Sequence, residues 1–143
     1  NEISINSYFI DTNIIIYSFD NDALVKKDIA LALIKQALMQ QVGCISYQVT
    51  QEALNVLVRK FHEKLTTDDV KLFLQEVLSP LQLINPSCIL FERAISIQSR
   101  WKYSFYDSLI IAGALESNCN ILYSEDLHDG QKIEGLEIVN PFV

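Results

Sequence analysis

Short apolar segments alternate with long amphipathic ones along this 143-residue chain, and this alternation constrains the fold more than any other feature. Runs of strand length occur at 8–10, 44–45, 81–84, 120–123 and 136–139. Helical periodicity covers about 23–41, 46–63, 66–79, 87–103 and 104–118. Apolar strands joined by amphipathic helices are typical of a parallel sheet covered by helices on both faces. We therefore predict one α/β domain over residues 1–143.

The composition excludes several classes of protein. Half of the residues are apolar and Gly and Pro are few, so the chain is not disordered or collagen-like. Its formal charge of −7 argues against a general polyanion-binding surface. The longest apolar run, 109–115, is too short to span a bilayer, and residues 1–8 lack the pattern of a signal peptide. Three cysteines without C-x-x-C spacing indicate free, buried thiols, so we expect a cytoplasmic protein without membrane contact.

Acidic residues fall at positions that bring them toward one edge of such a sheet. Working sites of parallel sheets lie beyond the carboxyl ends of the strands. Asp11 directly follows the first strand, and Asp126 follows the fourth by three residues. Asp107 begins a helix with an apolar continuation, and Glu52 borders an apolar helical stripe. Converging carboxylates repel one another unless a cation lies among them, and hard oxygen ligands suit Mg²⁺ or Mn²⁺.

Each of these acids also has a purely structural interpretation. Asp11 is suited to cap the helix that follows it, and Asp107 lies three residues after Ser104, the spacing of a capping box. Glu52 is also typical of an acid flanking an apolar helix face, and Asp126 of a turn residue. From the residues alone, both interpretations of each acid stay open.

Four segments carry a resemblance to a known family. The segments are Tyr-Phe-Ile-Asp-Thr-Asn (8–13), Gln-Glu (51–52), Ser-Phe-Tyr-Asp-Ser-Leu-Ile-Ile-Ala-Gly-Ala-Leu (104–115), and Ile-Leu-Tyr-Ser-Glu-Asp-Leu-His-Asp-Gly-Gln (121–131) followed by Asn-Pro-Phe (140–142). In this order they resemble the PIN-domain ribonucleases, and most closely the VapC-like toxins of type II toxin–antitoxin pairs. The resemblance covers nearly the whole chain.

The resemblance implies a three-layer domain with a central parallel sheet of four or five short strands flanked by helices. It implies that Asp11, Glu52, Asp107 and Asp126 hold Mg²⁺ or Mn²⁺ for RNA cleavage. It further implies a homodimer and an antitoxin partner. Supporting roles beside the acids would fall to Asn13, Ser124 and Asp129, and the division of work among Glu125, Asp126 and Asp129 stays open.

The basic residues before Asp107 and the activity itself each have an alternative interpretation. Arg100 and Lys102 alternate with aromatic residues just before Asp107, a combination that binds phosphates and stacks on unpaired bases. The alternative is a buried Trp101 with charges that cap a helix C-terminus. The alternative to a nuclease is a catalytically silent PIN-like module that acts only through partners.

Overall fold

A computed structural model describes residues 6–143, which form a six-stranded sheet with the order β3-β2-β1-β4-β6-β5. All neighbouring strands are parallel except β5, which pairs antiparallel with β6. The strands are β1 (Tyr8–Ile10), β2 (Gly43–Ser46), β3 (Gln82–Ile84), β4 (Ile121–Tyr123), β5 (Lys132–Ile133) and β6 (Leu136–Val139). The five parallel strands confirm the predicted α/β class. The two-residue strand β5 was not predicted.

The helices confirm the predicted alternation. They are α1 (Thr12–Tyr17), α2 (Leu24–Met39), α3 (Tyr47–Lys60), α4 (Thr67–Phe73), which continues into a π-helical turn η1 (Leu74–Leu78), α5 (Cys88–Trp101) and α6 (Phe105–Glu116). The side chains of Ser46, Thr66, Ser87 and Ser104 cap four of these helices, because each accepts a hydrogen bond from a backbone N–H in the first turn. The predicted helix starts are therefore confirmed, whereas several predicted ends run up to three residues too far.

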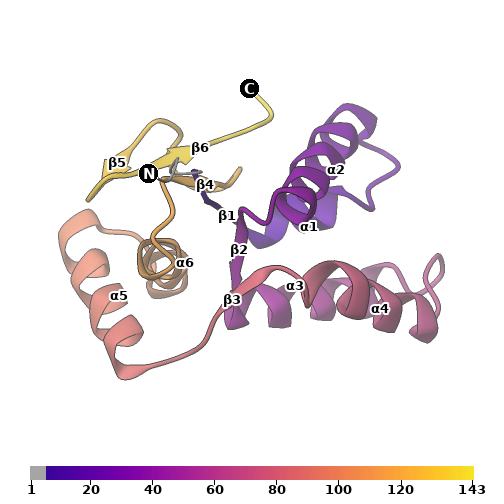
Figure 1. The fold of residues 1–143 in the computed structure, drawn as a ribbon, viewed down its shortest axis with the longest axis horizontal. Coiled ribbons are helices and arrows are strands. Elements are labelled where there is room, and N and C mark those ends of the chain that lie inside the picture. The colour runs from indigo at the N-terminus through magenta and orange to yellow at the C-terminus, as the bar shows by residue number, and fades with distance from the viewer. Residues whose placement is uncertain (1–5) are drawn as a thin grey trace.

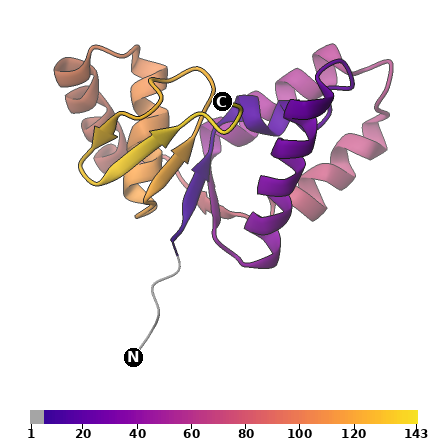
Figure 2. The ribbon, with the colours of Figure 1, turned by 90° about the horizontal axis from the view of Figure 1, so that it is seen from above.

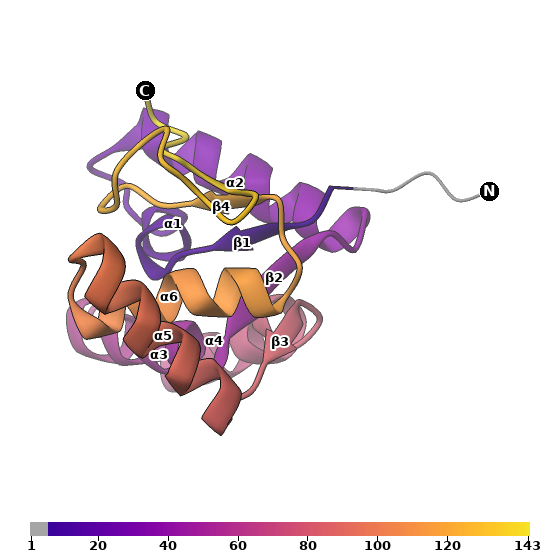
Figure 3. The same ribbon diagram turned by 90° about the vertical axis from the view of Figure 1, so that its left-hand side faces the viewer.

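The elements form three layers. Helix α2 covers one face of the central strands, while α6, with α5 outside it, covers the other (Figures 1 and 3). Successive side chains of β1 point to opposite faces of the sheet and so show this arrangement. The Tyr8 hydroxyl donates to the Leu33 carbonyl of α2 at 2.6 Å, whereas the Phe9 ring faces α6 at Gly113. The core accordingly lies on both sides of β1, whose three residues are all buried.

The position of β1 determines where its end projects. From β1 the sheet extends through β2 and β3 on one side and through β4 and β6 on the other. The strand order therefore reverses between β1 and β4. Ligand sites of open parallel sheets lie at such a reversal. The C-terminal end of the chain also lies near this edge, beside α1 (Figure 2), where Phe142 packs edge-on against Tyr17.

No helix among the described residues is long and apolar enough to cross a membrane. Cys44 and Cys119 are buried but Cys88 is exposed, so the expectation of buried thiols is wrong for one of the three. The expectation about a signal peptide falls mostly on residues 1–5, which lie outside the described residues.

The packing of α2 on the sheet depends on a glycine. A Cβ at Gly43 would lie 2.3 Å from the Cβ of Ala37. Since alanine has no flexible side chain that could move aside, the backbone of one of the two elements would have to shift. Gly43→Ala should therefore lower the free energy of unfolding by about 1–3 kcal/mol, as overpacked cores do. The measurement is urea denaturation.

Gly113→Ala is the matched control. A Cβ at Gly113 in α6 would meet Phe9 at 3.4 Å, an ordinary van der Waals distance. Alanine is also a better helix former than glycine by about 1 kcal/mol, so this variant should be as stable as the parent or more so. Equal stability of the two variants would contradict the close packing of α2 on β2.

Candidate active site

A cavity of about 580 Å³ opens at the carboxyl edge of the sheet. The four predicted acids, which come from four separate segments, all line it: Asp11, Glu52, Asp107 and Asp126. Two more acids, Asp20 and Glu125, lie in the same wall. The folded chain therefore brings together side chains that are dispersed over the whole sequence.

Asp11 lies at the base of this cavity, at the junction of β1 and α1. It is the N-cap of α1, where one carboxylate oxygen accepts from the Thr12 N–H at 2.7 Å. The other oxygen accepts from the Ser124 hydroxyl at 2.7 Å. Burial raises the pKa of Asp11 from 3.8 to about 6; these two hydrogen bonds oppose that rise, and the charges of Glu52 and Asp126 add to it. Capping and site formation are thus compatible roles of one carboxylate.

Glu52 reaches the cavity from the middle of α3. One of its carboxylate oxygens accepts from the Thr12 hydroxyl at 2.8 Å, and the other accepts from the Gln48 amide at 3.2 Å. A solvent-facing acid beside an apolar stripe would not need partners on both oxygens. These contacts fix the orientation of Glu52 relative to α1.

The Asp107 carboxylate does not form a capping box. The Ser104 hydroxyl accepts from the Asp107 N–H at 3.1 Å, but within residues 6–143 no hydrogen bond reaches the Asp107 carboxylate. Helix α4 offers the comparison, because there Asp69 accepts from the Thr66 N–H at 2.9 Å and completes a reciprocal box. The Asp107 carboxylate is therefore available to the cavity.

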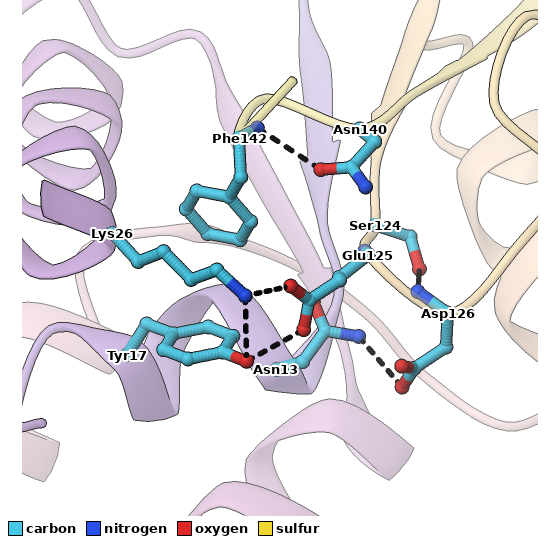
Figure 4. Close-up of polar contacts among 8 residues, drawn as sticks. All are labelled: Asn13, Tyr17, Lys26, Ser124, Glu125, Asp126, Asn140 and Phe142. Atoms are coloured by element: carbon cyan, nitrogen blue, oxygen red, sulfur yellow. Dashed lines mark hydrogen bonds and ion pairs between the residues drawn. The ribbon is translucent and has the colours of Figure 1, made fainter. Parts of the chain in front are cut away.

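Asp126 is held in place by Asn13, as Figure 4 shows. The Asn13 amide donates to Asp126 at 3.0 Å, and its oxygen accepts from the Glu125 N–H at 3.2 Å. The buried Ser124 hydroxyl also accepts from the Asp126 N–H at 3.2 Å. The loop after β4 is thus joined to the start of α1 by the two contacts of Asn13, and the Ser124 contact braces the loop internally.

Glu125 points away from Asp126 and toward α2 (Figure 4). It forms an ion pair with Lys26 and accepts from the Tyr17 hydroxyl at 2.6 Å. Burial alone would raise the pKa of Glu125, but the hydrogen bonds from Lys26 and Tyr17 outweigh this and lower the pKa. The Phe142 ring lies 5.5 Å from the Lys26 ammonium. Glu125 therefore anchors the loop to α2, and Asp126 is free to face the cavity.

Three other candidates lie outside the cavity lining. The Asp129 carboxylate accepts from the Asn140 N–H at 2.8 Å and so ties down the C-terminal segment. The Arg100 guanidinium lies 5.1 Å from the Trp101 ring, and Lys102 ends α5 in a left-handed conformation. Trp101 is partly buried against the core.

Sequence reasoning missed several polar residues of the cavity wall, among them Thr12, Gln48 and Lys60. Thr12 lies within the segment already singled out, so its position was a usable signal. Gln48 lies one helical turn before Glu52, a spacing that places both on one face of α3. Lys60 ends α3, and its position in the cavity depends on the packing of α3 against α1, which no local sequence pattern indicates.

The donor set suits a divalent cation. Carboxylate oxygens are the ligands of Mg²⁺ and Mn²⁺, and a buried carboxylate beside like charges is relieved by a cation. Within the described chain, however, no group of three or more Asp, Glu, His or Cys side chains is placed closely enough to hold a metal ion. Mg²⁺ commonly binds through one or two carboxylates and retains water, so the residues fit a partial cage that is open to substrate.

Comparison with known proteins adds independent information. A family model described as PIN domain matches residues 8–129, and no curated protein matches the sequence. A toxin–antitoxin complex from Klebsiella pneumoniae has 26% identity and a TM-score of 0.68, with 94% of this chain and 98% of that chain covered.

Two further solved structures, at lower identity, share the fold. DNA-bound VapBC from Salmonella typhimurium has 15% identity and a TM-score of 0.66, over 94% of this chain and 97% of that one. Mycobacterium tuberculosis VapC20, described as a Sarcin-Ricin loop cleaving toxin, has 19% identity and a TM-score of 0.60, over 84% and 90%.

Proposed function

Because this chain belongs to the PIN domain family, we propose that it is a metal-dependent endoribonuclease that hydrolyses RNA phosphodiester bonds. The observation that carries the proposal is the convergence of Asp11, Glu52, Asp107 and Asp126 on one open cavity. Phosphodiester hydrolysis needs an activated water and neutralised phosphate oxygens, and carboxylate-held cations supply both. The toxin described as cleaving the Sarcin-Ricin loop shares the fold and supports RNA as the substrate.

In this proposal the chain's own residues hold the acids in place. Thr12 and Ser124 orient Glu52 and Asp11, and Asn13 orients Asp126. Asp11, Glu52, Asp107 and Asp126 would hold Mg²⁺ or Mn²⁺, which supplies Lewis-acid stabilisation of the phosphate when bound. Preorganised groups of this kind lower the cost of reorganisation during the reaction.

The partners follow from the same premise. Two of the structural relatives are toxin–antitoxin assemblies. They support the proposal that this chain is a toxin that acts in the cytoplasm and binds a protein antitoxin. A homodimer and one domain over residues 1–143 belong to the same proposal.

The direct test uses the purified protein with tRNA and rRNA in Mn²⁺ buffer. Cleavage that stops on addition of EDTA is the expected result. Absence of cleavage with Mn²⁺ and with Mg²⁺ would reject the nuclease and favour the silent interaction module.

Lys60 is the only Lys or Arg that lines the cavity among the described residues. In a chain of net charge −7, a positively charged side chain beside the acids can attract an RNA phosphate that flanks the cleaved bond. Lys60→Gln should raise KM for RNA by about 10-fold, leave kcat nearly unchanged, and reduce the salt dependence of binding by about one phosphate contact.

Arg59→Gln is the matched control, because Arg59 is exposed on the same helical turn but lies outside the cavity lining. It removes the same charge and should change KM much less. Equal effects of the two variants would mean that only the overall charge matters and that Lys60 contacts no phosphate.

A further inference from the structure

Gln48 carries a buried oxygen atom that has no hydrogen-bond partner within residues 6–143. In the described part of the chain, its Oε1 atom is one of two buried side-chain polar atoms without a hydrogen-bond partner, the other being the Ser108 hydroxyl. An unpartnered buried acceptor costs about 1–3 kcal/mol. An apolar side chain of similar length would avoid this cost. The cost offsets the contribution of the hydrogen bonds that the amide nitrogen donates, so the net gain in stability from a glutamine here is small.

The orientation of the Gln48 amide explains the unpartnered oxygen. Its nitrogen donates to Glu52 Oε2 at 3.2 Å and to the Tyr106 carbonyl oxygen at 3.3 Å. Both partners can only accept, so the amide must present its NH₂ group to them. The oxygen is then left on the side where the protein offers no donor.

These two hydrogen bonds join the helices that carry two of the acids. Glu52 lies in α3, and Tyr106 directly precedes Asp107 in α6. Since Thr12 donates to the other Glu52 oxygen, the carboxylate is held from both sides. Gln48 and Tyr106 both line the acidic cavity and a smaller, mainly apolar one, so their hydrogen bond lies in the wall between the two cavities.

We propose that Gln48 is a positioning residue, which fixes the Glu52 carboxylate relative to the start of α6 so that Glu52 and Asp107 serve one cation. This inference rests on the proposed function. Residues that orient metal ligands by hydrogen bonds change metal affinity by about 10- to 100-fold when they are replaced. Gln48 acts through Glu52 and does not touch the RNA.

The test compares Gln48→Met with Gln51→Met in the full chain, by calorimetric titration with Mn²⁺. Methionine keeps the length of the side chain and removes both hydrogen bonds. Gln51 is an exposed neighbour on α3 that lines only the smaller cavity and forms no side-chain hydrogen bond among the described residues. We expect Mn²⁺ affinity to fall about 10- to 100-fold for Gln48→Met and to stay unchanged for Gln51→Met. The Tm of metal-free Gln48→Met should stay close to that of the parent, because the loss of two hydrogen bonds and the removal of the unpartnered oxygen oppose each other.

A double-mutant cycle separates positioning from packing. If Gln48 acts through Glu52, then Gln48→Met should cause no further loss of Mn²⁺ affinity in a Glu52→Gln background. The KM for RNA should stay unchanged, while kcat falls at limiting Mn²⁺. A lower Tm with unchanged Mn²⁺ affinity would show a packing role and overturn the inference, as would losses that simply add in the double mutant.

The wild-type protein distinguishes the two levels of the proposal. Wild-type protein that neither binds Mn²⁺ nor cleaves RNA overturns both the nuclease and the role of Gln48. Wild-type protein that does both, with Gln48→Met indistinguishable from it, overturns the positioning role alone.

Discussion

Asp107→Ala should reduce RNA cleavage by about 1,000-fold or more, because loss of a carboxylate that holds a catalytic cation removes several kcal/mol of transition-state stabilisation. The same variant should lower the free energy of unfolding by less than about 0.5 kcal/mol. The reason is structural: the Asp107 carboxylate forms no hydrogen bond within the described residues, and Ser104 alone caps α6. Single-turnover cleavage and urea denaturation measure the two effects.

Asp69→Ala provides the opposite control at the equivalent position of α4. The Asp69 carboxylate accepts from the Thr66 N–H, and the residue lies on an exposed helix away from the cavity lining. Its loss should cost about 1 kcal/mol of stability and leave cleavage intact. If instead Asp107→Ala unfolds the protein while its cleavage per folded molecule is unchanged, Asp107 is a capping residue and the site assignment fails.

Asp11→Asn should stabilise the metal-free protein while it abolishes metal binding. Burial raises the pKa of Asp11 from 3.8 to about 6, so ionisation of this group disfavours the folded state. Below pH 3.8 the carboxyl is protonated in both states and has no cost. As pH rises from about 4 to 6, the free energy of unfolding falls. The loss reaches about 3 kcal/mol, because each unit of difference in pKa corresponds to about 1.36 kcal/mol.

The asparagine variant lacks this ionisation, and its oxygen can still accept from the Thr12 N–H at the helix cap. Its advantage over wild type should therefore grow between pH 4 and 6 and then level off. Saturating Mn²⁺ should raise the Tm of wild type only, by mass action on the folded state. Asp11→Asn that is less stable than wild type at every pH would show that hydrogen bonding, not charge burial, dominates at this position.

Much of the fold follows from local sequence. The apolar strand segments and the capping residues Ser46, Thr66, Ser87 and Ser104 are visible because helix caps and strand periodicity are short-range features. The strand β5 is not visible, since two residues carry no periodicity and its pairing with β6 depends on the turn between them. The close fit of Gly43 on Ala37 is likewise a contact between separate elements that no local pattern encodes.

The candidate site divides in the same way. That Asp11 and Asp126 emerge at one edge could be predicted, because both follow parallel strands. That Glu125 turns toward Lys26 while Asp126 turns toward Asn13 could not, since side-chain direction in a loop depends on partners far away in the sequence. Gln48 was missed for the related reason that its second partner is a backbone carbonyl of another helix.

The central place of β1 has a consequence for the timing of synthesis. The ribosome makes this strand well before its partner β4 and the loop with Asp126; Asn13 and Asp126 are 113 residues apart. A nascent chain that has emerged only as far as α5 exposes one unpaired side of β1 and lacks both Asp107 and Asp126. The acidic cavity can therefore assemble only after the loop that follows β4 has been translated, so synthesis of this segment sets the moment at which the protein acquires it.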